Sequence, residues 1–169
     1  YLGYEIKRKP NPKNIARYIV DHHIAGIANG RAEFGPRALG NRSLVADPRI
    51  DIKDTVNTIK RRQKFRPFAP AILEEYADEY FDGPMNEYMQ FVAQAKHDYE
   101  SVTHVDGSAR VQVVKRNCSS ILRPVLEEFY ELTGVPMLLN TSLNIKGKPM
   151  VNNEADGIIF ESKYKVKVF

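Results

Sequence analysis

The sequence predicts one α/β domain, and three observations lead to this prediction. Stretches with helical spacing of apolar residues alternate with short apolar stretches typical of buried strands. The 169 residues contain no internal repeat and no Ser/Gly-rich linker that would divide the chain. A chain of this length suits a single domain with a substantial core, because it buries about two-thirds of the surface of its unfolded form.

Local patterns predict the first elements of this domain and one of its longer helices. Asn11-Pro12 is a capped helix start, and the apolar stripe that follows it predicts a helix over 13–22. The apolar run Ile24–Ala28 is typical of a buried strand. Ser119 caps an amphipathic helix that ends at Gly134.

The rest of the chain is expected to continue this alternation. Residues 30–49 are rich in glycine and arginine and favour a loop with a short helical turn near 38–44. The remaining expected elements, in order, are a helix over 51–60, a strand over 67–73, a helix over 74–81, strands over 88–95, 109–114 and 136–139, a helix over 153–160 and a last strand over 163–169.

Composition narrows the class of protein. The formal net charge of +4 permits an anionic ligand without requiring one. The single cysteine, Cys118, excludes an internal disulfide and a four-cysteine zinc site and fits a reducing compartment. No apolar run approaches the roughly 18–20 residues of a membrane-spanning helix, so we expect a cytoplasmic protein without a membrane partner. The chain starts at Tyr1 without a methionine, so we expect it to be part of a longer protein.

Two basic segments are candidates for anion binding. In residues 30–43, three glycines spaced five apart alternate with Arg31, Arg37 and Arg42, which favours phosphate or carboxylate binding over a simple connector. Residues 60–66 carry five cations, which repel one another unless they are solvated or face an anion. On its own this cluster fits a phosphate site, a nucleic-acid surface or an ordinary solvated face equally well.

A third segment carries short polar side chains at the end of a predicted buried strand. Residues 140–144 read Asn-Thr-Ser-Leu-Asn, at the edge where open α/β sheets bind ligands, although turn formation is an alternative. His104 lies in a polar turn two residues from Asp106. The pair His22-His23 fits a structural role better than metal binding, and no pattern indicates a metal site or a catalytic triad.

Four segments in order resemble the C-terminal domain of the NodU/CmcH family of O-carbamoyltransferases. They are GRAEFGPRALGNRSLVADPR (30–49), FRPFAPAIL (65–73), THVDGSAR (103–110) and LTGVPMLLNTSLNIKGKP (132–149). The resemblance implies a YrdC-like fold, an α/β (α+β) domain with a twisted, largely mixed sheet flanked by helices, spanning 1–169. YrdC proteins show a Lys-x-Arg and a Ser-x-Asn pair near their nucleotide. Lys60-Arg61-Arg62 and Ser142-Leu143-Asn144 match these pairs.

The resemblance also implies a function for this domain. It would make carbamoyl adenylate from carbamoyl phosphate and ATP with Mg²⁺, while a preceding Kae/Hsp70-actin-like domain, absent from this chain, would hold a further metal and transfer the carbamoyl group to an acceptor hydroxyl compound. The residues implied as catalytic are Lys60, Arg62 and Arg66. Those implied to bind carbamoyl phosphate or ATP are Arg37, Arg42, Ser142, Asn144, Asn140, Thr141, Arg110 and His104, and no metal ligand is expected in this domain.

Two alternatives remain open at this point. A nucleic-acid-binding module would use the Lys60–Arg66 cluster, but Lys+Arg exceeds Asp+Glu by only four (25 against 21) and aromatic residues are not interleaved for stacking. A YrdC-type threonylcarbamoyl-adenylate synthase would use bicarbonate and threonine, and the run over 30–40 fits it poorly. The sequence permits a dimer and does not identify the acceptor.

Overall fold

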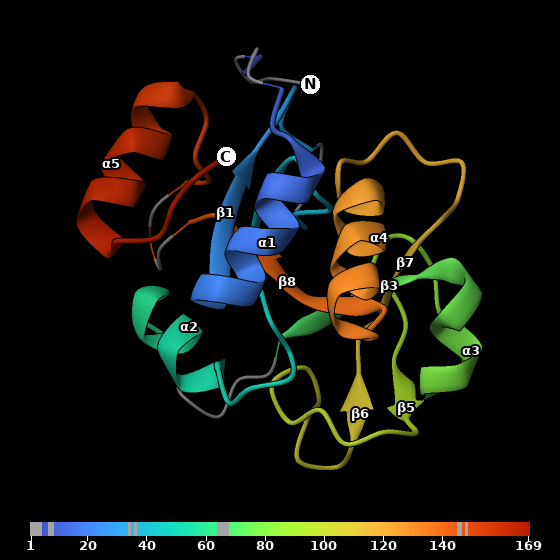
Figure 1. Cartoon of the computed structure of the whole chain (residues 1–169). Coiled ribbons are helices and arrows are strands. Elements are labelled where there is room, and N and C mark those ends of the chain that lie inside the picture. Colours follow the sequence, from blue (N-terminus) through green and yellow to red (C-terminus); the bar gives the residue numbers. More distant parts are fainter. Residues whose placement is uncertain are drawn as a thin grey trace.

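The fold consists of two sheets and five α-helices in the part of the chain that the computed structural model describes, residues 5–6, 9–33, 35, 37–63, 68–144, 147 and 149–169. Figure 1 shows their arrangement. In chain order the elements are α1 (Pro12–His22), β1 (Ile24–Ala28), β2 (Arg42–Ala46), α2 (Lys53–Ile59), β3 (Ala69–Leu73), a 3-10 turn (Glu74–Tyr76), α3 (Ala77–Tyr80), β4 (Phe81–Asp82), β5 (Ala93–Ala95), β6 (Ser108–Ala109), β7 (Gln112–Val114), α4 (Leu122–Thr133), β8 (Met137–Ser142) and α5 (Glu154–Tyr164).

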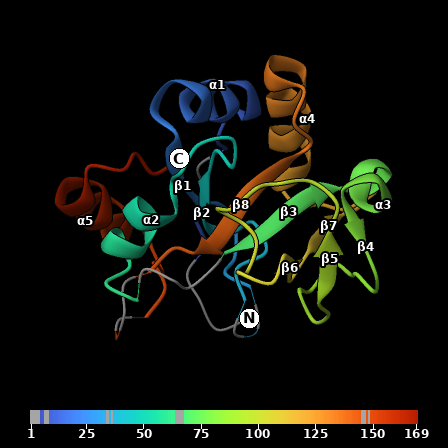
Figure 2. The same cartoon turned by 90° about the horizontal axis from the view of Figure 1, so that it is seen from below.

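The main sheet has five strands in the order β1-β2-β8-β3-β7, and only the β3–β7 pair is parallel. A second sheet has the order β4-β5-β6. Helices α1 and α4 lie together over one face of the main sheet, and α5 lies on the side of the molecule away from β4–β6 (Figures 1 and 2). A mixed sheet flanked by helices in one domain is the predicted fold class, which is therefore confirmed.

The first predicted helix forms for the reasons read from its sequence. The Asn11 side chain accepts hydrogen bonds from the backbone N–H of Lys13 and Asn14, and proline occupies the first turn. Ile15 and Ile19 are completely buried beneath the helix. The helix ends where His23 takes a left-handed conformation, with φ of 69°.

Strand β2 was not predicted, and the expected helical turn near 38–44 is wrong over its second half. Residues Arg42–Ala46 form a strand that is buried along its whole length. Arg42 and Ser43 are polar, so the segment lacks the continuous apolar pattern of a buried strand. The structure buries the Arg42 guanidinium by surrounding it with carbonyl oxygens, a tertiary effect that periodicity cannot show.

Other element boundaries also differ from the expected ones. The strand expected over 88–95 is limited to Ala93–Ala95, and the one expected over 109–114 is divided into β6 and β7. The last strand expected over 163–169 is wrong, because α5 continues to Tyr164 and only Val168 forms a bridge, with Gly26. A Cβ on Gly26 would lie 2.9 Å from the Val168 side chain, so this close approach requires glycine.

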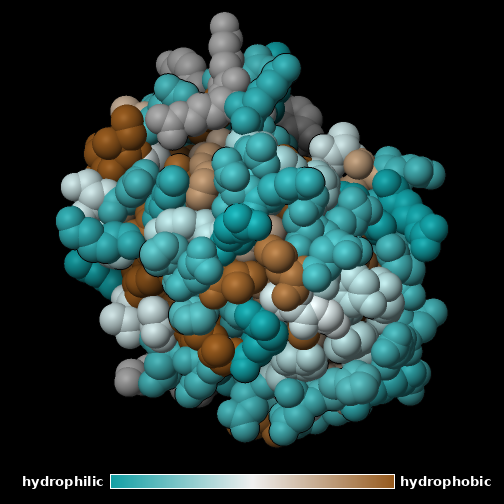
Figure 3. Space-filling model, in the orientation of Figure 1, coloured by the Kyte–Doolittle hydropathy of each residue, from teal (hydrophilic) through white to brown (hydrophobic). Residues whose placement is uncertain are grey.

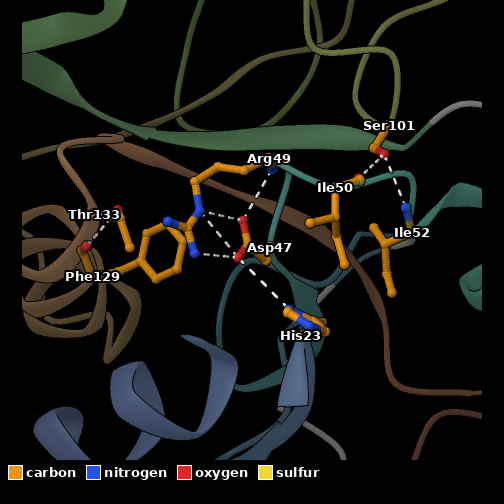
Figure 4. A network of polar contacts seen from close by, with 8 residues as sticks. All are labelled: His23, Asp47, Arg49, Ile50, Ile52, Ser101, Phe129 and Thr133. Carbon is orange, nitrogen blue, oxygen red and sulfur yellow. Dashed lines mark hydrogen bonds and ion pairs between the residues drawn. The ribbon is translucent and has the colours of Figure 1, made fainter. Parts of the chain in front are cut away.

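A buried carboxylate fixes the chain after β2 (Figure 4). Asp47 accepts hydrogen bonds from the backbone N–H of Arg49 at 3.0 Å and from its guanidinium at 2.7–3.1 Å. His23 Nδ1 lies 3.9 Å from Asp47 Oδ2, and the Arg49 guanidinium lies over the Phe129 ring of α4. The network therefore joins the end of α1, the end of β2 and α4, which agrees with the structural role predicted for His23.

None of the helices in the described part of the chain combines the length and the apolar character needed to cross a bilayer.

Asp47→Ala is expected to lower the free energy of unfolding by about 2 kcal/mol, because it removes a buried charge-assisted hydrogen-bond network while the guanidinium of Arg49 keeps some access to water. Urea denaturation measures this change. Asp51→Ala is the matched control, since Asp51 is exposed a few residues further on. Equal stability of the two variants would contradict the importance of the network.

Candidate functional site

The candidate site is built around the buried ammonium group of Lys60, which directly follows α2 and is only 4% exposed. Lys60 Nζ donates hydrogen bonds to the carbonyl oxygen of Ser142, to Ser142 Oγ at 3.1 Å and to Asn144 Oδ1 at 2.8 Å. Ser142 Oγ in turn donates to Asn144 Oδ1 at 2.7 Å. The fold therefore brings the Lys-x-Arg and Ser-x-Asn segments into direct contact across 82 positions of sequence.

The surroundings of Lys60 disfavour its charge. Burial, together with the nearby positive charge of Arg62, lowers the pKa of Lys60 from 10.5 to about 7. Its three hydrogen-bond acceptors are neutral oxygens, and no carboxylate among the described residues pairs with it. An anion placed near this ammonium group would therefore stabilise its charged form.

A cavity of about 110 Å³ adjoins this cluster at Ser142. Three arginines from separate segments line it, and none of its described lining residues is a carboxylate. A larger hollow of about 650 Å³ shares Arg37, Met89 and Arg110 with it, so the cavity continues outward past these side chains. The residues that line the cavity are Arg37, Ala38, Arg62, Phe68, Ala69, Met89, Arg110, Asn140, Thr141 and Ser142. This arrangement suits an anion.

Contacts with Asn57 and Phe68 help to hold Arg62 in place. Its Nε donates to Asn57 Oδ1 at 3.0 Å, and its guanidinium lies 4.2 Å from the centre of the Phe68 ring. Stacking on an aromatic face orients the guanidinium plane at the wall of the cavity. Asn57 was not predicted as a site residue, because no local pattern distinguishes it from any other helical asparagine.

Asn140 presents an unused acceptor in a buried position. Its Nδ2 donates to the carbonyl oxygen of Ala38 at 3.1 Å and to Gln112 Oε1 at 2.7 Å, while Gln112 Nε2 donates to the carbonyl oxygen of Leu39. These three bonds fix the orientation of both amides. Asn140 Oδ1 is buried and has no hydrogen-bond partner within the described segments. Asn140 is also one of the residues that line the cavity, and a buried acceptor without a partner is costly in a folded protein.

Arg42 has a structural role that replaces the anion-binding role expected from the sequence. The side chain is completely buried. Its five N–H groups donate to five backbone carbonyl oxygens, those of Asn29, Gly30, Asn41, Val151 and Asn152, at 2.8–3.2 Å. No donor is left for a ligand.

A carboxylate of the glycine-rich loop itself, that of Glu33, binds backbone amides of the loop. Glu33 Oε1 accepts hydrogen bonds from the backbone N–H of Leu39 at 2.8 Å and of Asn41 at 2.6 Å. These amides are therefore not available to a bound phosphate, contrary to the expectation for this loop. Among its described residues, Arg37 is the arginine that reaches the cavity.

The remaining predicted site residues are divided between the cavity and other places. Thr141 and Arg110 line the cavity. His104 is exposed in a turn where its backbone N–H donates to the carbonyl oxygen of Ser108, and it does not line the cavity. Arg66 lies outside the described residues, so its proposed phosphate contact stays a prediction.

Arg42→Lys is expected to lower the free energy of unfolding by about 3 kcal/mol. The reason is that a lysine has only three N–H donors, so at least two of the five buried carbonyl oxygens would lose their hydrogen bond. Urea denaturation measures the loss. Arg31→Lys is the matched control, since Arg31 is an exposed arginine of the same loop. An Arg42→Lys protein of unchanged stability would contradict the structural assignment.

Anion binding is expected to be coupled to proton uptake by Lys60. At pH 8.5 most of this group is neutral in the free protein, because its pKa is about 7, and a bound anion raises that pKa toward its ordinary value. Sulfate binding should therefore take up close to one proton at pH 8.5 and almost none at pH 6. Calorimetry in HEPES and in Tris measures this uptake, with Lys60→Met as the control. Equal uptake by wild type and Lys60→Met would exclude Lys60 as its source.

Comparison with known proteins identifies the family. Residues 16–169 match the family model described as the carbamoyltransferase C-terminus. The nodulation protein NolNO of Sinorhizobium fredii is 46% identical over 153 residues, which cover 85% of this chain and 22% of that protein. Nodulation protein U of Bradyrhizobium diazoefficiens is 41% identical over 140 residues, which cover 79% of this chain and 25% of that protein.

A solved structure supports the fold. Full-length HypF, crystallised in its phosphate- and nucleotide-bound form, aligns with a TM-score of 0.64 and 14% identity over 95% of this chain and 25% of its own. At this identity the likeness concerns the fold alone. The chain spans about a quarter of the length of the curated relatives it matches. From the match over most of its length, we conclude that this chain belongs to the carbamoyltransferase C-terminus family.

Proposed function

We propose that this domain forms carbamoyl adenylate from carbamoyl phosphate and ATP, and that it supplies the carbamoyl group to a hydroxyl acceptor bound by another part of a longer protein. Family membership supports carbamoyl transfer in general. The observation that carries the specific proposal is one cavity beside Lys60 that is lined by three arginines and by Asn140, whose amide oxygen has no hydrogen-bond partner among the described residues. Such a cavity matches a small ligand with a phosphate at one end and an amide at the other.

The reaction needs charge compensation more than it needs a nucleophilic side chain. Carbamoyl phosphate is first cleaved by water to carbamate and inorganic phosphate. A carbamate oxygen then attacks the α-phosphorus of ATP, forming one O–P bond and breaking the bond to the β-phosphate, so pyrophosphate leaves. Both reactants are anions, and guanidinium and ammonium groups lower the barrier by reducing their repulsion and by holding them in line.

The positions of the residues support separate roles in this proposal. Arg37 and Arg110, which line both the cavity and the hollow outside it, would hold phosphate groups on the way to solvent. Asn140 Oδ1 would accept a hydrogen bond from the carbamoyl NH₂ group. Lys60, held at the end of β8 with Ser142, would balance charge at the α-phosphate and become fully protonated when the anion binds.

Mg²⁺ enters this proposal as part of the substrate. Groups of three or more His, Cys, Asp or Glu side chains that could hold a metal ion are absent from the described residues. The lining residues that the structure describes likewise include no carboxylate. These residues do not fit a metal site built by the protein, whereas Mg²⁺ commonly binds ATP through its phosphate oxygens and retains water.

The same geometry weakens the case for a nucleic-acid surface. Lys60 is buried, and Arg62 is stacked on Phe68 at the cavity wall. Two of the five cations of the basic cluster therefore lie at the site and are not part of an exposed basic surface that could bind nucleic acid.

The test is calorimetric titration of carbamoyl phosphate into the wild-type chain and two variants. Arg110→Met should weaken binding at least about tenfold because it removes a charge-assisted contact to phosphate. Asn140→Leu should weaken carbamoyl phosphate binding about tenfold and leave ATP binding unchanged, because only the carbamoyl group meets this residue. Arg116→Met, at an exposed arginine away from the cavity, should change neither affinity.

Catalysis is tested by release of pyrophosphate from ATP. Release that depends on carbamoyl phosphate supports the proposal, and release that depends on bicarbonate with threonine would support the threonylcarbamoyl-adenylate alternative. A folded chain that shows no saturable binding of carbamoyl phosphate would falsify the proposal for this domain. Thermal melting of each variant shows whether a lost affinity reflects a lost fold.

A further inference from the structure

Two buried amide side chains meet across strand β3 of the main sheet. Hydrophilic side chains cover most of the face of the molecule in Figure 3, where water can satisfy them. Gln112 on β7 and Asn140 on β8 are instead only 3% and 1% exposed, and β3 lies between their strands (Figure 2). Asn140 Nδ2 nevertheless donates a hydrogen bond to Gln112 Oε1 at 2.7 Å.

The residues of β3 make this contact possible. Gln112 lies opposite Ala71, and Asn140 lies opposite Ala69. Alternate residues of a strand share one face of the sheet, so both amides stand on the same face as these two alanines. Strands β7 and β8 are about 10 Å apart, because neighbouring strands are separated by about 5 Å. The short methyl side chains between them leave the space in which the two amides meet.

The amide pair is bound to the glycine-rich loop. Asn140 Nδ2 also donates to the carbonyl oxygen of Ala38, and Gln112 Nε2 donates to the carbonyl oxygen of Leu39, each at 3.1 Å. Ser120 Oγ donates to the same Leu39 oxygen at 3.1 Å. The backbone of both loop residues is therefore fixed to the sheet and to the segment before α4.

Arg37 directly precedes these two loop residues and lines the cavity together with Arg62 and Arg110, and we call this cavity the arginine cavity. Contacts with Asn57 and Phe68 help to hold the guanidinium of Arg62. Neither a hydrogen bond nor an ion pair with another described residue holds the side chain of Arg37. The place of Arg37 at the cavity therefore depends on the backbone that follows it.

We propose that Gln112 is a positioning residue that holds Arg37 at the arginine cavity. Gln112 is not among the residues that line this cavity, and it acts through the Leu39 carbonyl group and through Asn140. An anion in the cavity gains the charge-assisted contact of Arg37 only while the loop is held against the sheet. The inference rests on the proposed function, because the anion is taken to be the phosphate group of carbamoyl phosphate.

The experiment measures the binding of carbamoyl phosphate and of sulfate by calorimetry. Gln112→Met removes both hydrogen bonds of the amide at a similar side-chain volume, and it should weaken the binding of both ligands about tenfold. Gln112→Val, which has a high strand propensity, is a second variant with the same expected loss. Gln94→Met is the matched control and should change neither affinity, because Gln94 is exposed and its amide donates to the Asp106 carbonyl oxygen away from the cavity.

Double variants separate positioning from a general loss of structure. In an Arg37→Met protein, the further change Gln112→Met should alter either affinity less than about twofold, because the group that Gln112 positions is already missing. In an Arg62→Met protein the same change should still weaken binding about tenfold, because Arg62 has contacts of its own. Thermal melting shows that each variant is folded.

The outcomes separate this inference from the function on which it rests. Wild type that binds sulfate but not carbamoyl phosphate overturns the proposed function, and the sulfate affinities then test the role of Gln112 by themselves. Wild type that binds neither ligand overturns both. Folded Gln112 variants that bind both ligands like wild type overturn the inference alone. Equal losses in the Arg37→Met and Arg62→Met proteins also overturn it, because the amide pair then only stabilises the fold.

Discussion

The burial of the Lys60 ammonium group is the interaction on which the rest of the site depends. A buried cation is costly unless it is well solvated by the protein, and here the solvation comes from oxygens at the end of β8, those of Ser142 and Asn144. The same bonds hold the end of α2 against the central strand of the sheet. Local stability and affinity for an anion are thereby linked, because a bound anion supplies the charge that the neutral oxygens lack.

Carboxylates balance the charges of two arginines that lie outside the site. Arg49 is bound to Asp47, and Arg123 to Glu75 and Glu127, so their charges are largely balanced within the fold. None of the described residues that line the arginine cavity is a carboxylate. A modest net charge of +4 is therefore compatible with a cavity that three arginines line.

Local sequence patterns predicted those elements that depend on local chemistry. The helix that Asn11 caps is present as expected, because a cap and an apolar stripe act within a few residues. Helix α4 ends at Gly134 as expected, but the predicted Ser119 cap is wrong, because the helix begins at Leu122 after Ile121 without a side-chain cap. The contact of Lys60 with Ser142 joins segments far apart in sequence, and only the family resemblance associated them. The unpartnered oxygen of Asn140 could not be predicted at all, since it depends on how Gln112 orients the amide.

Arg42 shows why a residue can be essential to a site that it does not touch. Its guanidinium binds the carbonyl oxygens of Asn29 and Gly30 at the start of the glycine-rich loop, and those of Val151 and Asn152 just before α5. The loop leads to the arginine cavity, so this one buried side chain fixes the start of the loop against the segment before α5. All five donors of the arginine are used on the backbone, and they hold these two segments at a constant separation.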